Sequence, residues 1–183
     1  MRLPRTARGL SAAGAALALT VMLATGLDRD GPVTFVGDPD TGEATVGIEL
    51  DGGQAVFGAS VVRNGGDRAV TLRGASLVGD VPEEAARLAE ARVLEFREHG
   101  VDPVGAGPWP VDRYGELSVP LAGYRLEPGV ELELLLVVDV IEPGHWRWPR
   151  NVLEYEDSSG TAFRATSDLA FELTCSPAAT CHG

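Results

Sequence analysis

The sequence is organised around VELELLLVVDV, residues 130–140, which is its most apolar run outside the N-terminus. The first half of the run alternates, because Glu131 and Glu133 separate apolar neighbours. The second half is apolar on both faces, which is typical of a strand covered on one side at its start and on two sides further along. Pro-Gly pairs at 128–129 and 143–144 bound the run, and it is too short to cross a bilayer as a helix. We therefore predict a central strand of an all-β domain.

Between residues 33 and 174, about eight short stretches of β pattern are separated by turn signals at intervals of roughly 8–12 residues. This spacing predicts a mainly β fold, an antiparallel β-sandwich, with a barrel as the alternative. We expect residues 44–50 and 54–63 to form a hairpin through Asp51-Gly52-Gly53. Residues 117–121 should form an edge strand, because Pro120 lacks the N–H that an inner strand needs.

One segment departs from the β pattern. Residues 82–91 consist of helix formers, with Pro at the first position and acids in the first turn, so they predict one short helical insertion that ends near Arg92. Residues 93–97 fit either an extension of this helix or a strand. Residues 100–115 are rich in Gly and Pro and predict a long loop.

Composition and charge limit the possible functions of the chain. The chain has 183 residues, of which 44% are hydrophobic, so one domain with an ordinary core and extensions is expected. The formal net charge is -12. Such an acidic chain would be repelled by phosphate backbones and by anionic lipid headgroups, so we expect no nucleic-acid partner.

The N-terminus carries a targeting pattern. Arg2, Arg5 and Arg8 precede an uncharged segment, residues 9–27, and the positive-inside rule places the N-terminus in the cytoplasm and the rest outside. Residues 1–27 therefore form either an uncleaved signal anchor, with the chain single-pass in the cell membrane through residues 9–27, or a cleaved signal peptide of a secreted protein. Residues 28–32 would be a linker.

The middle of the chain also resembles a known kind of module. Residues 61–72 hold a strand, the turn Asn64-Gly65-Gly66-Asp67 and a second strand, and the sequence 126–129 precedes the long apolar strand. With Leu153-Glu154-Tyr155 and Gly160, this arrangement resembles actinobacterial membrane-anchored or secreted proteins with one immunoglobulin-like β-sandwich module. The resemblance implies an immunoglobulin-like sandwich over residues 33–174, with a C-terminal tail at 175–183. It implies no activity, because such sandwiches host many functions.

Two residue pairs are candidate sites. Cys175 and Cys181 are the only cysteines, and outside the cytoplasm they should form a disulfide that closes a short loop. Trp146 and Trp148 fall on one face of an extended segment and predict an aromatic surface for a ligand, the alternative being that both are core residues.

Catalytic templates are absent from the sequence, and the acidic loop at residues 38–43 fails the calcium-loop register at two positions. We therefore predict no catalytic residues, no cofactor and no metal site, and class the chain as not an enzyme. The predicted function is an extracytoplasmic module of the bacterial cell envelope that binds a protein or cell-wall partner. The alternatives are a small-molecule or carbohydrate binder that uses Trp146 and Trp148, and a hydrolase whose site matches no known motif.

Overall fold

The computed structural model describes residues 31–37, 44–50 and 53–176, and these residues form thirteen strands and two one-turn helices. The fold is mainly β, as predicted. The elements are β1 (Val33–Val36), β2 (Thr45–Leu50), β3 (Gly53–Asn64), β4 (Val70–Val78), β5 (Ala86–Leu94), α1 (Phe96–His99), β6 (Ala106–Trp109), α2 (Tyr114–Leu117), β7 (Val119–Pro120), β8 (Arg125–Leu126), β9 (Glu131–Val140), β10 (Gly144–Trp148), β11 (Arg150–Glu156), β12 (Ala162–Ser167) and β13 (Ala170–Cys175).

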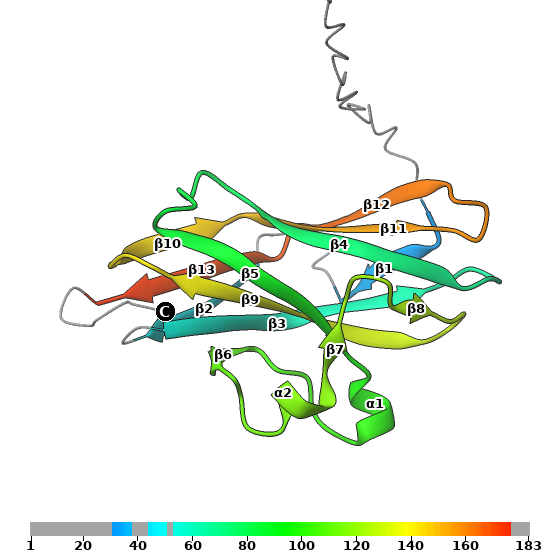
Figure 1. Cartoon of the computed structure of the whole chain (residues 1–183), viewed down its shortest axis with the longest axis horizontal. Coiled ribbons are helices and arrows are strands. Elements are labelled where there is room, and N and C mark those ends of the chain that lie inside the picture. Colours follow the sequence, from blue (N-terminus) through cyan, green and yellow to red (C-terminus); the bar gives the residue numbers. More distant parts are fainter. Residues whose placement is uncertain (1–30, 38–43, 51–52, 177–183) are drawn as a thin grey trace, which may run out of the picture.

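The strands form two stacked layers (Figure 1). The first layer is a sheet in the order β1-β3-β9-β5-β7, with β6 also paired to β3. The second layer holds the sheets β10-β13-β2 and β12-β11-β4-β8, which continue into each other because β10 leads directly into β11 and β12 into β13. Among the described pairs, β13 with β2 is parallel and the others are antiparallel, so the predicted antiparallel sandwich contains one parallel exception.

The predicted central strand is confirmed as β9, which pairs with β3 on one side and β5 on the other. Its even-numbered residues, Leu132 to Val140, face the second layer and belong to the core between the layers. Leu135 and Val137 point to the opposite face and belong to a separate apolar cluster. Both faces of β9 are therefore buried, which explains why its sequence stops alternating.

The core between the layers is aromatic at both ends. Phe57 of β3 stacks on Phe171 of β13 with ring centroids 4.8 Å apart, and Trp148 meets the Phe57 ring edge-on at 6.0 Å. At the other end, Tyr155 stacks on Phe163 at 5.5 Å, and its hydroxyl accepts a hydrogen bond from the Val33 N–H at 3.2 Å. These contacts join strands of both layers into one core.

Residues 96–118, which we call the cover, lie beneath the outer face of the first layer (Figure 1). Apolar side chains of the cover pack on Leu135 and Val137 of β9; they are Phe96, Val101 and Val104, with Trp109, Val111, Tyr114 and Leu117 partly buried beside them. The prediction of a long loop at residues 100–115 was wrong in part, because this segment contains β6 and the start of α2. Edge pairing of β6 with β3 and apolar burial order it.

The predicted helical insertion was wrong. The Pro82 carbonyl accepts hydrogen bonds from the N–H groups of Ala85 and Ala86, which makes a turn, and β5 begins there instead of a helix. Pairing with β9 buries Ala86, Val93 and Leu94, so burial in the sheet outweighs the helix propensity of this alanine-rich segment. Residues 93–97 are divided between the end of β5 and the start of α1.

The expected hairpin between residues 44–50 and 54–63 is also corrected. Strand β2 pairs in parallel with β13 and not with β3, so β2 and β3 belong to different layers. Strands β3 and β4 likewise belong to different layers. The buried Asn64 holds the crossover between them, because its amide donates to the carbonyls of Arg68 and Leu126 and accepts from the Gly66 N–H. By contrast, the expected edge strand is confirmed as β7, which pairs with the end of β5.

The predicted N-terminal anchor or signal segment, residues 1–27, lies outside the described residues, as does most of the linker. Among the residues that the structure describes, no helix is long and apolar enough to cross a membrane.

Candidate functional site

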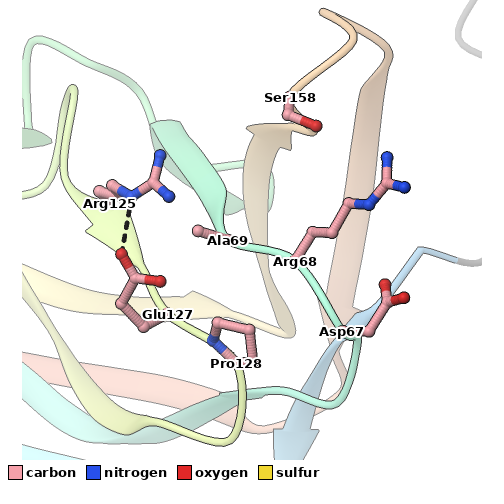
Figure 2. Close-up of a pocket in the computed structure, with 7 residues that line it drawn as sticks. All are labelled: Asp67, Arg68, Ala69, Arg125, Glu127, Pro128 and Ser158. Atoms are coloured by element: carbon pink, nitrogen blue, oxygen red, sulfur yellow. Dashed lines mark hydrogen bonds and ion pairs between the residues drawn. The ribbon is translucent and has the colours of Figure 1, made fainter.

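A recess of about 350 Å³ opens at the end of the sandwich where three connections meet. We call it the arginine recess, and its lining residues are Asp67, Arg68, Ala69, Arg125, Glu127, Pro128 and Ser158. Figure 2 shows the two arginines on either side of Ala69, with the Ser158 hydroxyl above them. The recess is therefore polar, with a cationic group on each side.

Buried Asn64 fixes the relative position of two of these connections. Residues 67–69 come from the β3–β4 crossover, while Arg125 and Glu127 come from β8 and the turn after it. The Asn64 amide donates to the Arg68 carbonyl at 2.9 Å and to the Leu126 carbonyl at 3.0 Å. Since Asn64 is fully buried, these bonds are protected from water and hold the walls of the recess in place.

The two guanidinium groups differ in their partners. Arg125 donates from Nε to Glu127 Oε1 at 2.7 Å. Within the described part of the chain, the Arg68 guanidinium forms no ion pair, although its charge contributes to lowering the pKa of nearby Asp157. The main cause of that lowered pKa is the hydrogen bond from the Ser159 hydroxyl to Asp157. Arg68 thus keeps its hydrogen-bond donors for an external acceptor.

This arrangement suits a carboxylate ligand. A guanidinium presents a planar fork of donors that matches a carboxylate, and charge-assisted hydrogen bonds of this kind are stronger than neutral ones. Asp67 and Glu127 on the rim would in turn favour an amine on the same ligand. No sequence pattern singles out this recess, because residues 64–69, 125–128 and 158 are far apart along the chain and meet only through the fold.

The predicted aromatic residues lie elsewhere. Trp146 and Trp148 share one face of β10, as alternation predicted, but that face is turned to the core. Trp148 is 4% exposed and packs on Phe57, and Trp146 packs against the same cluster. The two indoles therefore form no aromatic surface. This corrects the alternative of a small-molecule or carbohydrate binder, because that alternative required Trp146 and Trp148 to be exposed to a ligand.

An unpredicted carboxylate lies under the cover. Glu133 of β9 is fully buried, and it accepts hydrogen bonds from the Ala59 N–H at 2.8 Å and the Val104 N–H at 3.0 Å. Ala59 has φ 60° in a bulge of β3, and a Cβ at Gly58 would collide with the Val104 carbonyl and the Glu133 carboxylate. Burial raises the pKa of Glu133 to about 7, against the opposing effect of the two N–H donors.

Cys175 ends β13 and is buried, while Cys181 lies outside the described residues, so their disulfide stays a prediction. The acidic loop at residues 38–43 also lies outside them. Among the described side chains, no group of three or more His, Cys, Asp or Glu residues gathers as metal ligands would.

This chain has only weak similarity to known proteins. No protein-family model matches the sequence, and neither does any curated protein. The fold is similar to the VesB protease of Vibrio cholerae, at 14% identity and a TM-score of 0.32 over 72% of this chain and 30% of VesB. It is also similar to the PapD-like domain 7 of human CEP192, at 13% identity and a TM-score of 0.41 over 89% of this chain and 97% of that domain.

The classification of the chain as not an enzyme is corrected by these comparisons. Besides VesB, they include the secreted serine protease VesC of Vibrio cholerae, at 14% identity and a TM-score of 0.32 over 70% of this chain and 21% of VesC. The chain spans less than a third of either protease. At these TM-scores the likeness assigns neither a fold family nor an activity, and we withdraw the classification without replacing it.

Proposed function

We propose that this chain is an extracytoplasmic binding module of the bacterial cell envelope, built on an immunoglobulin-like sandwich, whose arginine recess binds a peptide carboxylate of a protein or cell-wall partner. The observation that carries the proposal is the pair of guanidinium groups on either side of one recess, of which the Arg68 group forms no ion pair among the described residues. Loops at one end of a rigid sandwich are a common place for binding residues.

The net charge of the chain limits the class of ligand that the arginine recess can bind. A net charge of -12 repels long polyanions, so the recess is suited to a single carboxylate and not to a polymer of phosphates. The rim carboxylates of Asp67 and Glu127 reduce the local positive potential and complement an amine. A peptide, which carries both kinds of group, meets both requirements.

A binding experiment tests the recess. The probe is trialanine with a free C-terminal carboxylate, compared with trialanine amide, and the readout is the backbone amide shifts of residues 67–69 and 125–127 in the full chain. We expect the free acid to shift these amides and the amide peptide to leave them unchanged. Arg68→Ala and Arg125→Ala should each abolish the shifts.

Arg113→Ala is the matched control, because Arg113 is an exposed arginine of the cover, away from the recess, and forms no ion pair among the described residues. Equal shifts from both peptides, or shifts that survive in both recess variants, would contradict the assignment. Purified cell wall and a cell-surface protein extract, offered to the same variants, then distinguish the two sources of peptide.

The envelope location is tested separately. The pattern of Arg2, Arg5 and Arg8 before an uncharged segment supports export of the body of the chain. Protease added to intact cells should digest residues 33–174 of the full chain while leaving cytoplasmic markers whole. Mass spectrometry of the membrane fraction then distinguishes a retained anchor from a released, shortened form. Full protection from the protease would refute the location.

A further inference from the structure

Strand β4 has a backbone edge that pairs with nothing over most of its length. One side of β4 pairs with β11, while on the other side β8 pairs at Val70 and Thr71 and residues 123–124 bond to Leu72. From Arg73 to Val78, this second side receives no backbone hydrogen bond within the described residues. Exposed strand edges of this kind are templates for another strand.

Only the first residue of this free edge, Arg73, is charged, and it lies at a bulge in the pairing with β11. Gly74-Ala75-Ser76-Leu77-Val78 has no charge and no proline. Several other edges carry the usual protective features. These are Arg87, Glu90 and a bulge in β5, Pro108 in β6, Pro120 in β7, Arg147 in β10 and Arg164 in β12. Edge strands normally avoid pairing with other chains through such residues or by being short, as β1 (Val33–Val36) is. Residues 74–78 of β4 have neither kind of protection.

A groove of about 300 Å³ runs beside this edge, between the two layers. We call it the edge groove, and its apolar lining residues are Leu77, Val81, Ala86, Leu88 and Trp148. Gly79 closes one end, where a Cβ would lie 2.8 Å from the Arg147 carbonyl oxygen. A strand added to β4 would direct alternate side chains into this groove, since successive side chains of a strand point to opposite faces.

The charges around the edge groove indicate what kind of segment would bind there. The loop that follows β4 exposes Asp80, Glu83 and Glu84, and none of them forms an ion pair among the described residues. Two nearby cations, Arg73 and Arg87, are already paired with Glu156 and Asp139, while Arg150, opposite Val78, forms no ion pair among the described residues. A second copy of this chain would bring the same acidic loop and another net charge of -12 to the contact, so like charges disfavour it.

We propose that the free edge of β4 and the edge groove bind an extended segment of a partner protein that has apolar residues at alternate positions and basic residues beside them. Main-chain hydrogen bonds to Gly74–Val78 supply the pairing, and the groove selects the apolar side chains. The acidic loop at residues 80–84 holds the basic residues. This surface is separate from the arginine recess, which lies at the opposite end of β4, and it does not depend on the proposed function.

The test uses a peptide, Lys-Lys-Val-Thr-Val-Thr-Val-Lys-Lys, and the full chain. In one variant of the peptide the three valine amides are N-methylated, and in a second variant the two threonine amides are. Because alternate residues of a strand direct their N–H groups to the same edge, only one of these variants keeps the donors that β4 needs. Binding is measured by intrinsic tryptophan fluorescence, since Trp148 lines the groove, and by hydrogen exchange of residues 74–78.

We expect the unmodified peptide and one N-methylated peptide to bind and to slow exchange at residues 74–78, while the other binds at least about tenfold more weakly. Glu83→Lys should weaken binding several-fold, and Glu116→Lys, an exposed glutamate of α2 on the cover, should not. Equal binding of both N-methylated peptides would overturn the proposal by showing adsorption through side chains alone. No binding of the unmodified peptide would also overturn it.

Discussion

The two faces of the β3–β9–β5 sheet are both buried, but they are built differently. The inner face presents the aliphatic side chains Leu132, Leu134, Leu136 and Val138 to the second layer, and all are fully buried. The outer face has Leu135 and Val137 under the cover, with the carboxylate of Glu133 between them and the bulge of β3. The contacts of these inner-face leucines and Val138 are therefore apolar packing, whereas the attachment of the cover also depends on hydrogen bonds to one ionisable group.

Truncation of one leucine on each face should separate the two contributions. Leu136→Ala removes a fully buried side chain between the layers, and we expect a loss of about 3–5 kcal/mol in the free energy of unfolding. Leu135→Ala, its neighbour on the outer face, should cost about 2–3 kcal/mol, because the cover can settle into part of the space. Urea denaturation measures both.

Hydrogen exchange identifies where each loss acts. Leu135→Ala should speed exchange chiefly in residues 96–118, and Leu136→Ala should speed it throughout the sandwich. Equal losses with identical exchange patterns would show that the cover and the sandwich unfold as one unit, and the comparison between the faces would then fail.

The pH dependence of stability tests the Glu133 contact. Burial raises the pKa of Glu133 to about 7 from an ordinary value of 4.5, so between these values the folded protein holds a proton that the unfolded chain has released. This stabilisation is fully present below the unfolded pKa and is lost as the pH rises through the folded pKa. We expect the free energy of unfolding to fall by about 1 kcal/mol between about pH 6 and pH 8.

Glu133→Gln should remove that slope, because a glutamine does not titrate. Glu131→Gln is the matched control, since Glu131 lies two residues earlier on the same face of β9 and pairs with Arg97 in the cover. Chemical denaturation at several pH values provides the measurement. A slope that persists unchanged in Glu133→Gln would place the titrating group elsewhere in the molecule.

Arg92 provides a second polar attachment, at the other end of the cover. Its guanidinium donates to the Ser118 carbonyl at 2.6 Å, to the Ser118 hydroxyl at 2.9 Å and to the Gly115 carbonyl at 3.3 Å, and it lies 5.9 Å from the centre of the Trp109 ring. A lysine cannot reproduce this fork of donors, so Arg92→Lys should cost about 1–2 kcal/mol. Thermal unfolding measures the loss, and an unchanged melting temperature would refute it.

The sequence was informative about the inner face and much less so about the outer one. The apolar run at 130–140 predicted β9, because burial on two faces leaves a visible pattern in the residues. The helix expected at 82–92 failed, since Ala86, Val93 and Leu94 are held in β5 by pairing with β9, a strand distant in the chain, which propensity does not describe.

The candidate sites show the same limit. Trp146 and Trp148 were correctly placed on one face, but the sequence could not say that the face is turned to the core. In the alternating sequence pattern, Glu133 occupies a position where an exposed residue is expected. It is buried only because the cover lies over it, and Val104 of the cover is 29 residues earlier in the chain. The arginine recess is formed by three connections that the fold brings together, so no local sequence pattern predicts it.

The ion pair between Arg97 of α1 and Glu131 should make the smallest contribution to holding the cover. Arg97 donates from Nε to Glu131 Oε2 at 2.9 Å, but its side chain is 70% exposed. Water screens such a pair and the long side chain loses rotamer freedom in it, so Arg97→Ala should cost about 0–1 kcal/mol. The loss should shrink further in high salt, unlike the Glu133 contribution. A salt-insensitive loss as large as that of Leu135→Ala would show that surface charge, and not the buried contacts, attaches the cover to β9.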